Sequence, residues 1–229
     1  MRKGLQHRQP PKRRDVFNLL LTIANDKEVQ HARVLLQAYA PYVPKLDKAP
    51  GGALIRASAR AGALSEALEL LSDYRELRFL PSLGSTLFLM QKLGQAGRVE
   101  DAVRAHGIMV SALPDDPRCW SADYLETLTR SYLKEGQHGK AAKMFATFRE
   151  MGCMPPVMLY RLALSQCSEA CHDAATSSDA LAAVALFEGG IKADKHQDPT
   201  CDQLVAKAKQ AAEDAQKPQA EEEASAGEG

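Results

Sequence analysis

The chain has 229 residues, with 29 lysines plus arginines and 29 aspartates plus glutamates, so its formal net charge at pH 7 is zero. A neutral chain lacks the global cationic field that attracts nucleic acid, which argues against binding driven by overall charge. The longest unbroken apolar run, Ala180 to Phe187, is far shorter than the roughly 20 residues that span a bilayer. Five cysteines at irregular spacing do not suggest a disulfide framework, so we expect a reducing compartment.

The first 14 residues form a basic arm without a single acid. Three interpretations fit this arm: a solvated disordered tail, an RNA-contacting tail, or part of an organelle-targeting segment. The pair Pro10 and Pro11 weakens the targeting-helix interpretation. The candidate contact residues of the arm are Arg2, Lys3, Arg8, Lys12, Arg13 and Arg14.

Apolar residues at helical period then predict helices in pairs. The clearest pair lies within 124–156, with a tight turn at Gly136, a left-handed Gly152 at the end of the second helix, and Pro155 after it. The other predicted pairs are 15–25 with 26–40, 53–61 with 64–79, 84–95 with 98–112, and 156–171 with 178–189. Residues 45–52 read as a linker, and Gly189 with Gly190 as the end of the last pair.

A small residue recurs in the second helix of each pair. Its positions are Ala32, Ala67, Ala102, Ala141 and, in a degenerate copy, Ala183, with spacings of 35, 35, 39 and 42 residues. A short helical hairpin cannot bury its apolar face alone, so this period predicts an all-α solenoid of about five antiparallel hairpins rather than a plain helical bundle.

The segments that follow the repeats complete the predicted organisation. Residues 200–216 can form a last helix that covers the open end of the array, and the acidic, glycine-containing end should be disordered. We therefore expect a basic arm at 1–14, a repeat array at 15–190, a capping segment at 191–216 and an acidic tail at 217–229.

The repeat resembles the pentatricopeptide repeat (PPR) family, whose unit is two antiparallel helices in about 35 residues. The resemblance rests on the pattern from Tyr124 to Pro155, on Ala96 to Ala102, and on a proline 14 residues after the anchor alanine in two units (Pro81 and Pro155). The tetratricopeptide repeat fits less well because its tryptophan position is not matched; the only tryptophan, Trp120, precedes a helix.

The resemblance implies where a base-reading protein would carry its readers. Members of the family that read RNA use two polar side chains per unit, one near the start of the first helix and one at the unit's end. Counting 15 residues before each anchor, or from Tyr160 in the last unit, and 15 after it gives Phe17, Gly52, Leu87, Glu126 and Arg161, and Asp47, Ser82, Pro117 and Pro156. Most of these residues cannot bind a base edge, so we expect a scaffold that does not read sequence.

Two further sets of residues are candidates for function. Cations on the first helices could contact RNA or a partner, although ordinary solvated helix charge is the alternative: Arg56, Arg60, Lys92, Arg130, Lys134 and Arg161. Cys167, Cys171 and His172 could supply zinc ligands, but zinc takes four, and buried cysteines that act as small hydrophobes are the commoner case. No nucleophile, base and oxyanion-donor set is recognisable, so we expect no enzyme, no cofactor and no small-molecule substrate.

The resemblance, the missing readers and the basic arm together imply a non-catalytic structural subunit of a mitochondrial ribonucleoprotein in the matrix. We expect the small subunit of the mitochondrial ribosome, with neighbouring proteins and rRNA as partners. The alternatives are an organellar RNA-binding factor in RNA processing or translation, and a scaffold subunit of a respiratory-chain complex.

Overall fold

The computed structural model describes residues 12–23, 25–42, 48–173 and 175–226, without the side chains of 13, 17, 21, 26, 48, 49 and 216–226. Within these ranges the secondary structure is helical, with two short 3-10 helices at Ala40–Tyr42 and Pro117–Trp120. The α-helices are α1 Arg13–Leu21, α2 Asp26–Tyr39, α3 Lys48–Arg60, α4 Leu64–Ser72, α5 Leu83–Gln95, α6 Val99–Ala112, α7 Ala122–Lys134, α8 His138–Glu150, α9 Val157–Ala170, α10 Ser177–Ala193 and α11 Pro199–Ala226. The prediction of an all-α helical-repeat fold is confirmed.

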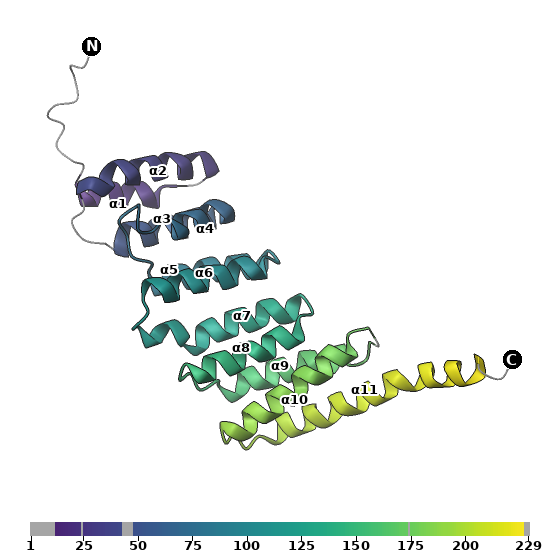
Figure 1. The fold of residues 1–229 in the computed structure, drawn as a ribbon. Helices are drawn as coiled ribbons and strands as arrows, with labels where there is room; N and C mark the ends of the chain where they lie inside the picture. The colour runs from purple at the N-terminus through teal and green to yellow at the C-terminus, as the bar shows by residue number, and fades with distance from the viewer. Residues whose placement is uncertain (1–11, 24, 43–47, 174, 227–229) are drawn as a thin grey trace, which may run out of the picture. The chain divides into compact units, whose positions relative to one another are not determined.

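The chain divides into two compact units, the first formed by residues 1–96 and 100–119 and the second by residues 97–99 and 120–229. In the first unit, α3 lies at the centre and packs against α1, α4 and α5 (Figure 1). An ion pair between Arg33 on α2 and Glu69 on α4, at 3.1 Å, joins neighbouring second helices. Arg33 also pairs with Asp73, so this guanidinium connects two successive hairpins.

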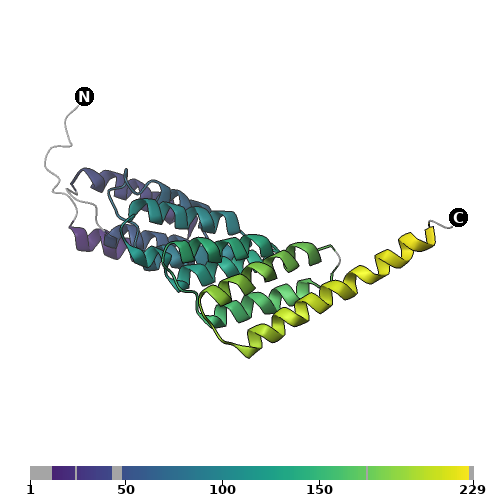
Figure 2. The same cartoon turned by 60° about the horizontal axis from the view of Figure 1, so that its bottom comes forward.

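The second unit contains the hairpins α7–α8 and α9–α10 and ends with α11. Figure 2 shows α9, α10 and α11 lying side by side, and α11 contacts both of the other two. The inward face of α11 carries Cys201, Val205, Ala208 and Ala211, all buried. This helix therefore covers the end of the last hairpin, as a capping helix does in a repeat array.

The anchors and turn glycines explain why each hairpin closes. The five anchor alanines are at most 4 % exposed, so each lies in a contact between packed helices. A small side chain at such a contact lets the two helices approach closely. Gly152 adopts the left-handed conformation predicted for it, and so do the glycines that precede three of these anchors: φ is 85° at Gly62, 74° at Gly97, 68° at Gly136 and 87° at Gly152. A left-handed residue is strained unless it is glycine, so these positions set the ends of the helices.

Two predicted boundaries in the first unit are wrong. The supposed linker 45–52 is helical from Lys48 onward, because Pro50 falls in the first turn of α3, where its missing N–H costs nothing. The predicted helix 64–79 ends at Ser72. Beyond it, Arg78 has a positive φ and the Phe79 ring turns back into the space beside Gly51, where a Cβ would lie 2.0 Å from the ring.

The predicted end of the fifth hairpin is also wrong, since α10 continues through Gly189 and Gly190 to Ala193. Gly190 is there for contact rather than termination: a Cβ would lie 2.8 Å from the Tyr160 hydroxyl. Helix α11 continues past residue 216 to Ala226, through a segment rich in alanine and glutamate, which favour helix. The disorder predicted for the acidic tail is therefore wrong for residues 217–226. The last residues of that prediction, 227–229, lie outside the described ranges.

Candidate nucleic-acid interface

The predicted reader positions Gly52 and Ser82 lie together in the first unit. A Cβ on Gly52 would lie 3.0 Å from Ser82 Oγ and 2.8 Å from Ser85 Oγ. The Ser85 hydroxyl donates to the Gly52 carbonyl oxygen (3.0 Å), so Ser82 Oγ must donate the 2.6 Å bond between the two hydroxyls. The Ser82 oxygen also accepts from the Ser85 amide at the start of α5. Both hydroxyls are thus committed to the protein's own backbone and to each other.

The reader position of the fifth unit, Arg161, is likewise paired within the chain. Its Nε donates to Asp198 Oδ2 at 2.6 Å and its Nη2 to Asp198 Oδ1 at 2.8 Å, a two-pronged ion pair. The guanidinium hydrogen bond lowers the pKa of the Asp198 carboxyl and raises the pKa of Arg161, which holds both groups charged. Asp198 stands 15 residues after Ala183, which is the unit-ending position of the fifth repeat.

Sequence reasoning missed Asp198 as a functional candidate, although counting 15 residues beyond the degenerate anchor Ala183 would have found it. The remaining reader positions do not form pairs that could hold a base edge. Leu87 is half-buried, and Pro117 and Pro156 have no side-chain donor. Glu126 binds Arg130 one turn along α7 at 2.8 Å. Asp47 and the side chain of Phe17 lie outside the described part of the chain.

The predicted contact cations differ in how they are engaged. In the first unit Arg56 and Arg60 are exposed on one face of α3, and the Arg56 guanidinium extends over α5, where a Cβ on Gly84 would lie 2.7 Å from it. Lys92 lies over the Phe88 ring, 5.8 Å from its centroid, and donates to Gln95. Arg56 and Arg60 on α3 and Lys92 on the neighbouring α5 therefore form the part of the candidate interface that lies in the first unit.

In the second unit the cations are more occupied. Arg130 and Arg161 are in the ion pairs described above, and Lys134 is exposed in the last turn of α7. In the basic arm, Lys12 and Arg14 are exposed, whereas Arg2, Lys3, Arg8 and the side chain of Arg13 lie outside the described residues.

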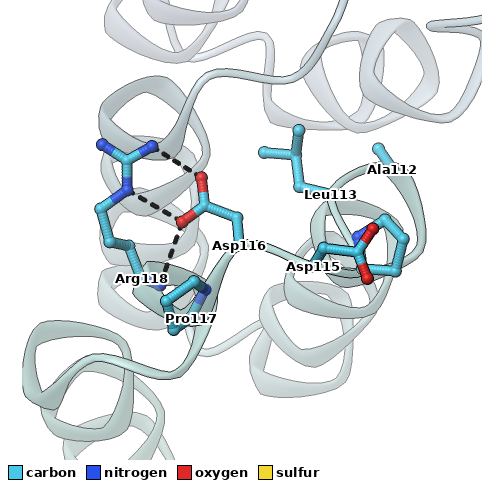
Figure 3. Close-up of a pocket in the computed structure, with 7 residues that line it drawn as sticks. Ala112, Leu113, Asp115, Asp116, Pro117 and Arg118 are labelled. Carbon is cyan, nitrogen blue, oxygen red and sulfur yellow. Dashed lines mark hydrogen bonds and ion pairs between the residues drawn. The ribbon is translucent and has the colours of Figure 1, made fainter.

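A surface hollow of about 590 Å³ lies along residues 112–118, between α6 and the second 3-10 helix (Figure 3). Figure 3 shows the Arg118 side chain beside Asp116, to which it is bound: Nε and Nη2 donate to the two carboxylate oxygens at 2.8 and 2.7 Å. This arginine is 69 % exposed at its side chain, yet its charge is balanced locally, so it offers a matched comparison for Arg56 and Arg60.

The cysteine cluster differs from the predicted zinc set. Cys167 and Cys171 are fully buried, but His172 is exposed, and the imidazole beside Cys167 is that of His138, with Nδ1 3.7 Å from Sγ. Burial raises the pKa of the Cys167 thiol to about 12 and lowers the pKa of His138, so both groups are neutral. Across the described ranges, no group of three or more His, Cys, Asp or Glu side chains is arranged to hold a metal ion.

The repeated hairpins define a helical-repeat protein, and none of its described helices is both long and apolar enough to cross a bilayer. Residues 52–79, which include most of α3, all of α4 and the turn after it, match the family described as PPR repeat. The fold is similar to the crystal structure of the pentatricopeptide repeat protein PPR10 from maize, with a TM-score of 0.44 and 17 % identity over 86 % of this chain. This chain covers 28 % of the length of that protein. No curated protein matches the sequence significantly.

Proposed function

We propose that this protein is a non-catalytic helical-repeat scaffold of a mitochondrial ribonucleoprotein, with the small subunit of the mitochondrial ribosome as the expected assembly. In this proposal it binds neighbouring proteins and contacts rRNA through phosphates, without reading bases. One observation carries the proposal. In the two units whose reader positions lie close together, Gly52 with Ser82 and Arg161 with Asp198, the polar side chains already form hydrogen bonds within the chain. The PPR repeat at 52–79 supports the link to RNA.

Reading a base edge requires two polar side chains whose hydrogen-bonding groups are available. Gly52 has no side chain, and the Ser82 hydroxyl is engaged with Ser85. Arg161 keeps part of its surface, with 37 % of its side chain exposed, but one edge of its guanidinium is filled by Asp198. A base approaching either pair would have to break hydrogen bonds that the folded chain already makes, which costs about 1 kcal/mol or more for each bond.

Phosphate contacts have no such requirement, because a cation needs only to be accessible. Arg56 and Arg60 lie one turn apart on the same face of α3, with Lys92 on the neighbouring α5. This arrangement favours general contact with a nucleic-acid backbone, which fixes position but carries no sequence information.

Selection from a randomised pool of single-stranded RNA tests whether the protein reads sequence. We expect the selected RNA to bind within about threefold of the starting pool, with affinity that falls steeply as salt is raised. A selected sequence bound about 100-fold more tightly would overturn the scaffold proposal and favour an organellar RNA-processing or translation factor.

The assembly is tested by sedimentation of a mitochondrial lysate that contains the tagged chain. We expect migration with small-subunit rRNA, and a shift to slow fractions after RNase treatment or removal of Mg²⁺. Migration with a respiratory-chain complex that is insensitive to RNase would contradict the ribosomal assignment and favour a scaffold subunit of that complex. Exclusion of the tagged chain from mitochondria would contradict the proposed location.

A further inference from the structure

We propose that Asp198 is a built-in competitor of RNA for Arg161, so that this arginine is withheld from the phosphate backbone. The inference rests on the proposed function, because it concerns how strongly the repeat surface holds RNA. In this inference Asp198, which lies between the last hairpin and the capping helix, lowers the affinity of the chain for RNA.

The geometry of the pair is that of a complete ion pair. Two parallel bonds of 2.6 and 2.8 Å join the Nε and Nη2 groups of Arg161 to the two carboxylate oxygens of Asp198. A third nitrogen, Nη1, lies 3.6 Å from the sulfur of Met158. Arginine binds carboxylate and phosphate through the same planar fork, so Asp198 takes the place that a phosphate would take.

The competitor is held rigidly where it stands. Only 6 % of the Asp198 side chain is exposed, against 37 % for Arg161. The Asp198 carboxylate also accepts from the Thr200 amide at 3.2 Å and from the Cys201 thiol at 3.1 Å, which fixes it at the first turn of α11. Because α11 packs along α9, Asp198 cannot swing away without disturbing the capping helix.

An arginine whose charge is balanced by a fixed carboxylate gains little from a phosphate, because the phosphate must displace the carboxylate or bind beside it. Neutralising the carboxylate removes that cost and leaves an accessible guanidinium on α9. The predicted consequence is a gain of RNA affinity in the variant, opposite to the loss that most substitutions at an interface cause.

Asp198→Asn tests this inference, since asparagine caps helices as well as aspartate and keeps an oxygen for the Thr200 amide. We expect the variant to bind a mixed-sequence single-stranded RNA 20-mer about fivefold more tightly at about 0.1 M salt, with a log–log salt slope steeper by about 0.7. Arg161→Gln combined with Asp198→Asn should cancel the gain, because the double variant has no guanidinium to release.

Asp202→Asn is the matched control, because Asp202 is an exposed acid on α11, four residues after Asp198, and its removal changes the net charge equally. An equal gain from Asp202→Asn, or a gain that survives Arg161→Gln, would overturn the inference. Helical circular dichroism checks that each variant folds, and Asp198→Ser, with another capping side chain, replaces Asp198→Asn if that variant does not.

The two proposals fail in different ways. If the wild-type chain binds no RNA, general RNA contact is wrong; binding that then arises in Asp198→Asn and depends on Arg161 still supports the competitor role. If the wild-type chain binds RNA and folded Asp198→Asn binds it no better, the competitor role is wrong and RNA contact stands.

Discussion

At the scale of single residues, close approach explains glycines that would otherwise read as loop signals. Gly51 lies inside α3 with the ring of Phe79 in the space of its missing side chain. Gly107 lies inside α6 with nothing within 4 Å of the position of a Cβ. Glycine is therefore required by packing at position 51. At position 107 it only lowers stability, through the backbone entropy that it loses on folding.

Replacement of these two glycines by alanine should change stability in opposite directions. We expect Gly51→Ala to lower the free energy of unfolding by about 1–3 kcal/mol, because the buried Phe79 must leave its position. Gly107→Ala should raise it by about 0.5–1 kcal/mol through helix propensity. Urea denaturation followed by circular dichroism measures both values, and a stabilising Gly51→Ala would show that Phe79 does not occupy this space.

Buried histidines should make the fold sensitive to mild acid. His106 is 6 % exposed, and its Nε2 donates to the Cys119 carbonyl oxygen at 2.8 Å. Burial lowers its pKa below 6.5, so the unfolded chain takes up the proton first. This contribution to stability is therefore complete above pH 6.5 and is lost as the pH falls from there toward the lower pKa of the folded state.

The measurement is the free energy of unfolding between about pH 7.5 and about pH 5.5. We expect stability to fall over this interval in the wild-type chain and to fall less in His106→Asn. His31 is exposed on α2, so His31→Asn should keep the wild-type pH dependence. An unchanged pH dependence in His106→Asn would assign the effect to other groups, among them His138, whose pKa burial also lowers.

At the scale of helices, hairpin positions follow from sequence, whereas several helix ends do not. The 35-residue spacing of Ala32, Ala67 and Ala102 locates three hairpins, because a buried small residue must recur wherever helices pack in the same way. Pro50 and Gly190 led to wrong helix ends, because proline and glycine usually interrupt a helix but both lie inside helices here. Proline fits the first turn of a helix, and glycine fits a contact with a distant ring, which the sequence does not display.

The capping helix gives a test of this packing. Ala208 on α11 is fully buried, so Ala208→Arg places an unpaired charge against the last hairpin and should cost about 3–5 kcal/mol. Gln203→Arg puts the same side chain on the exposed face of α11 and should change stability by less than about 0.5 kcal/mol. Thermal unfolding measures both, and proteolysis between α10 and α11 should accelerate only in Ala208→Arg. Equal behaviour of the two variants would show that α11 does not cover this hairpin.

At the scale of the whole molecule, a neutral total conceals charges in very different states. The sequence locates Arg161 as a reader position but not its ion pair. Arg161 and Asp198 are 37 residues apart in the sequence, and only the fold brings them together. The sequence likewise does not show whether Arg56 or Arg118 has an acidic partner, because both are expected to be exposed arginines. The structure separates them: Arg118 is bound by its neighbour Asp116, whereas Arg56 extends over α5.

This distinction predicts which arginines carry the contact with RNA. An accessible cation that binds a phosphate releases a counterion, and each such contact adds about 0.7 to the log–log salt slope of single-strand binding. We therefore expect the pair of changes Arg56→Ser and Arg60→Ser to lower that slope by about 1.4. Arg118→Ser should leave it unchanged, because the Asp116 carboxylate already balances that guanidinium.

The measurement is fluorescence anisotropy of a labelled single-stranded RNA between about 0.05 and about 0.3 M salt, at fixed pH. A loss of slope in Arg118→Ser equal to that in the double variant would mean that RNA senses total charge alone. An unchanged slope in the double variant would move the contact away from α3, and the exposed Lys12 and Arg14 would be the next cations to replace. The comparison thus tests whether a chain with no net charge binds RNA through the local arrangement of its cations.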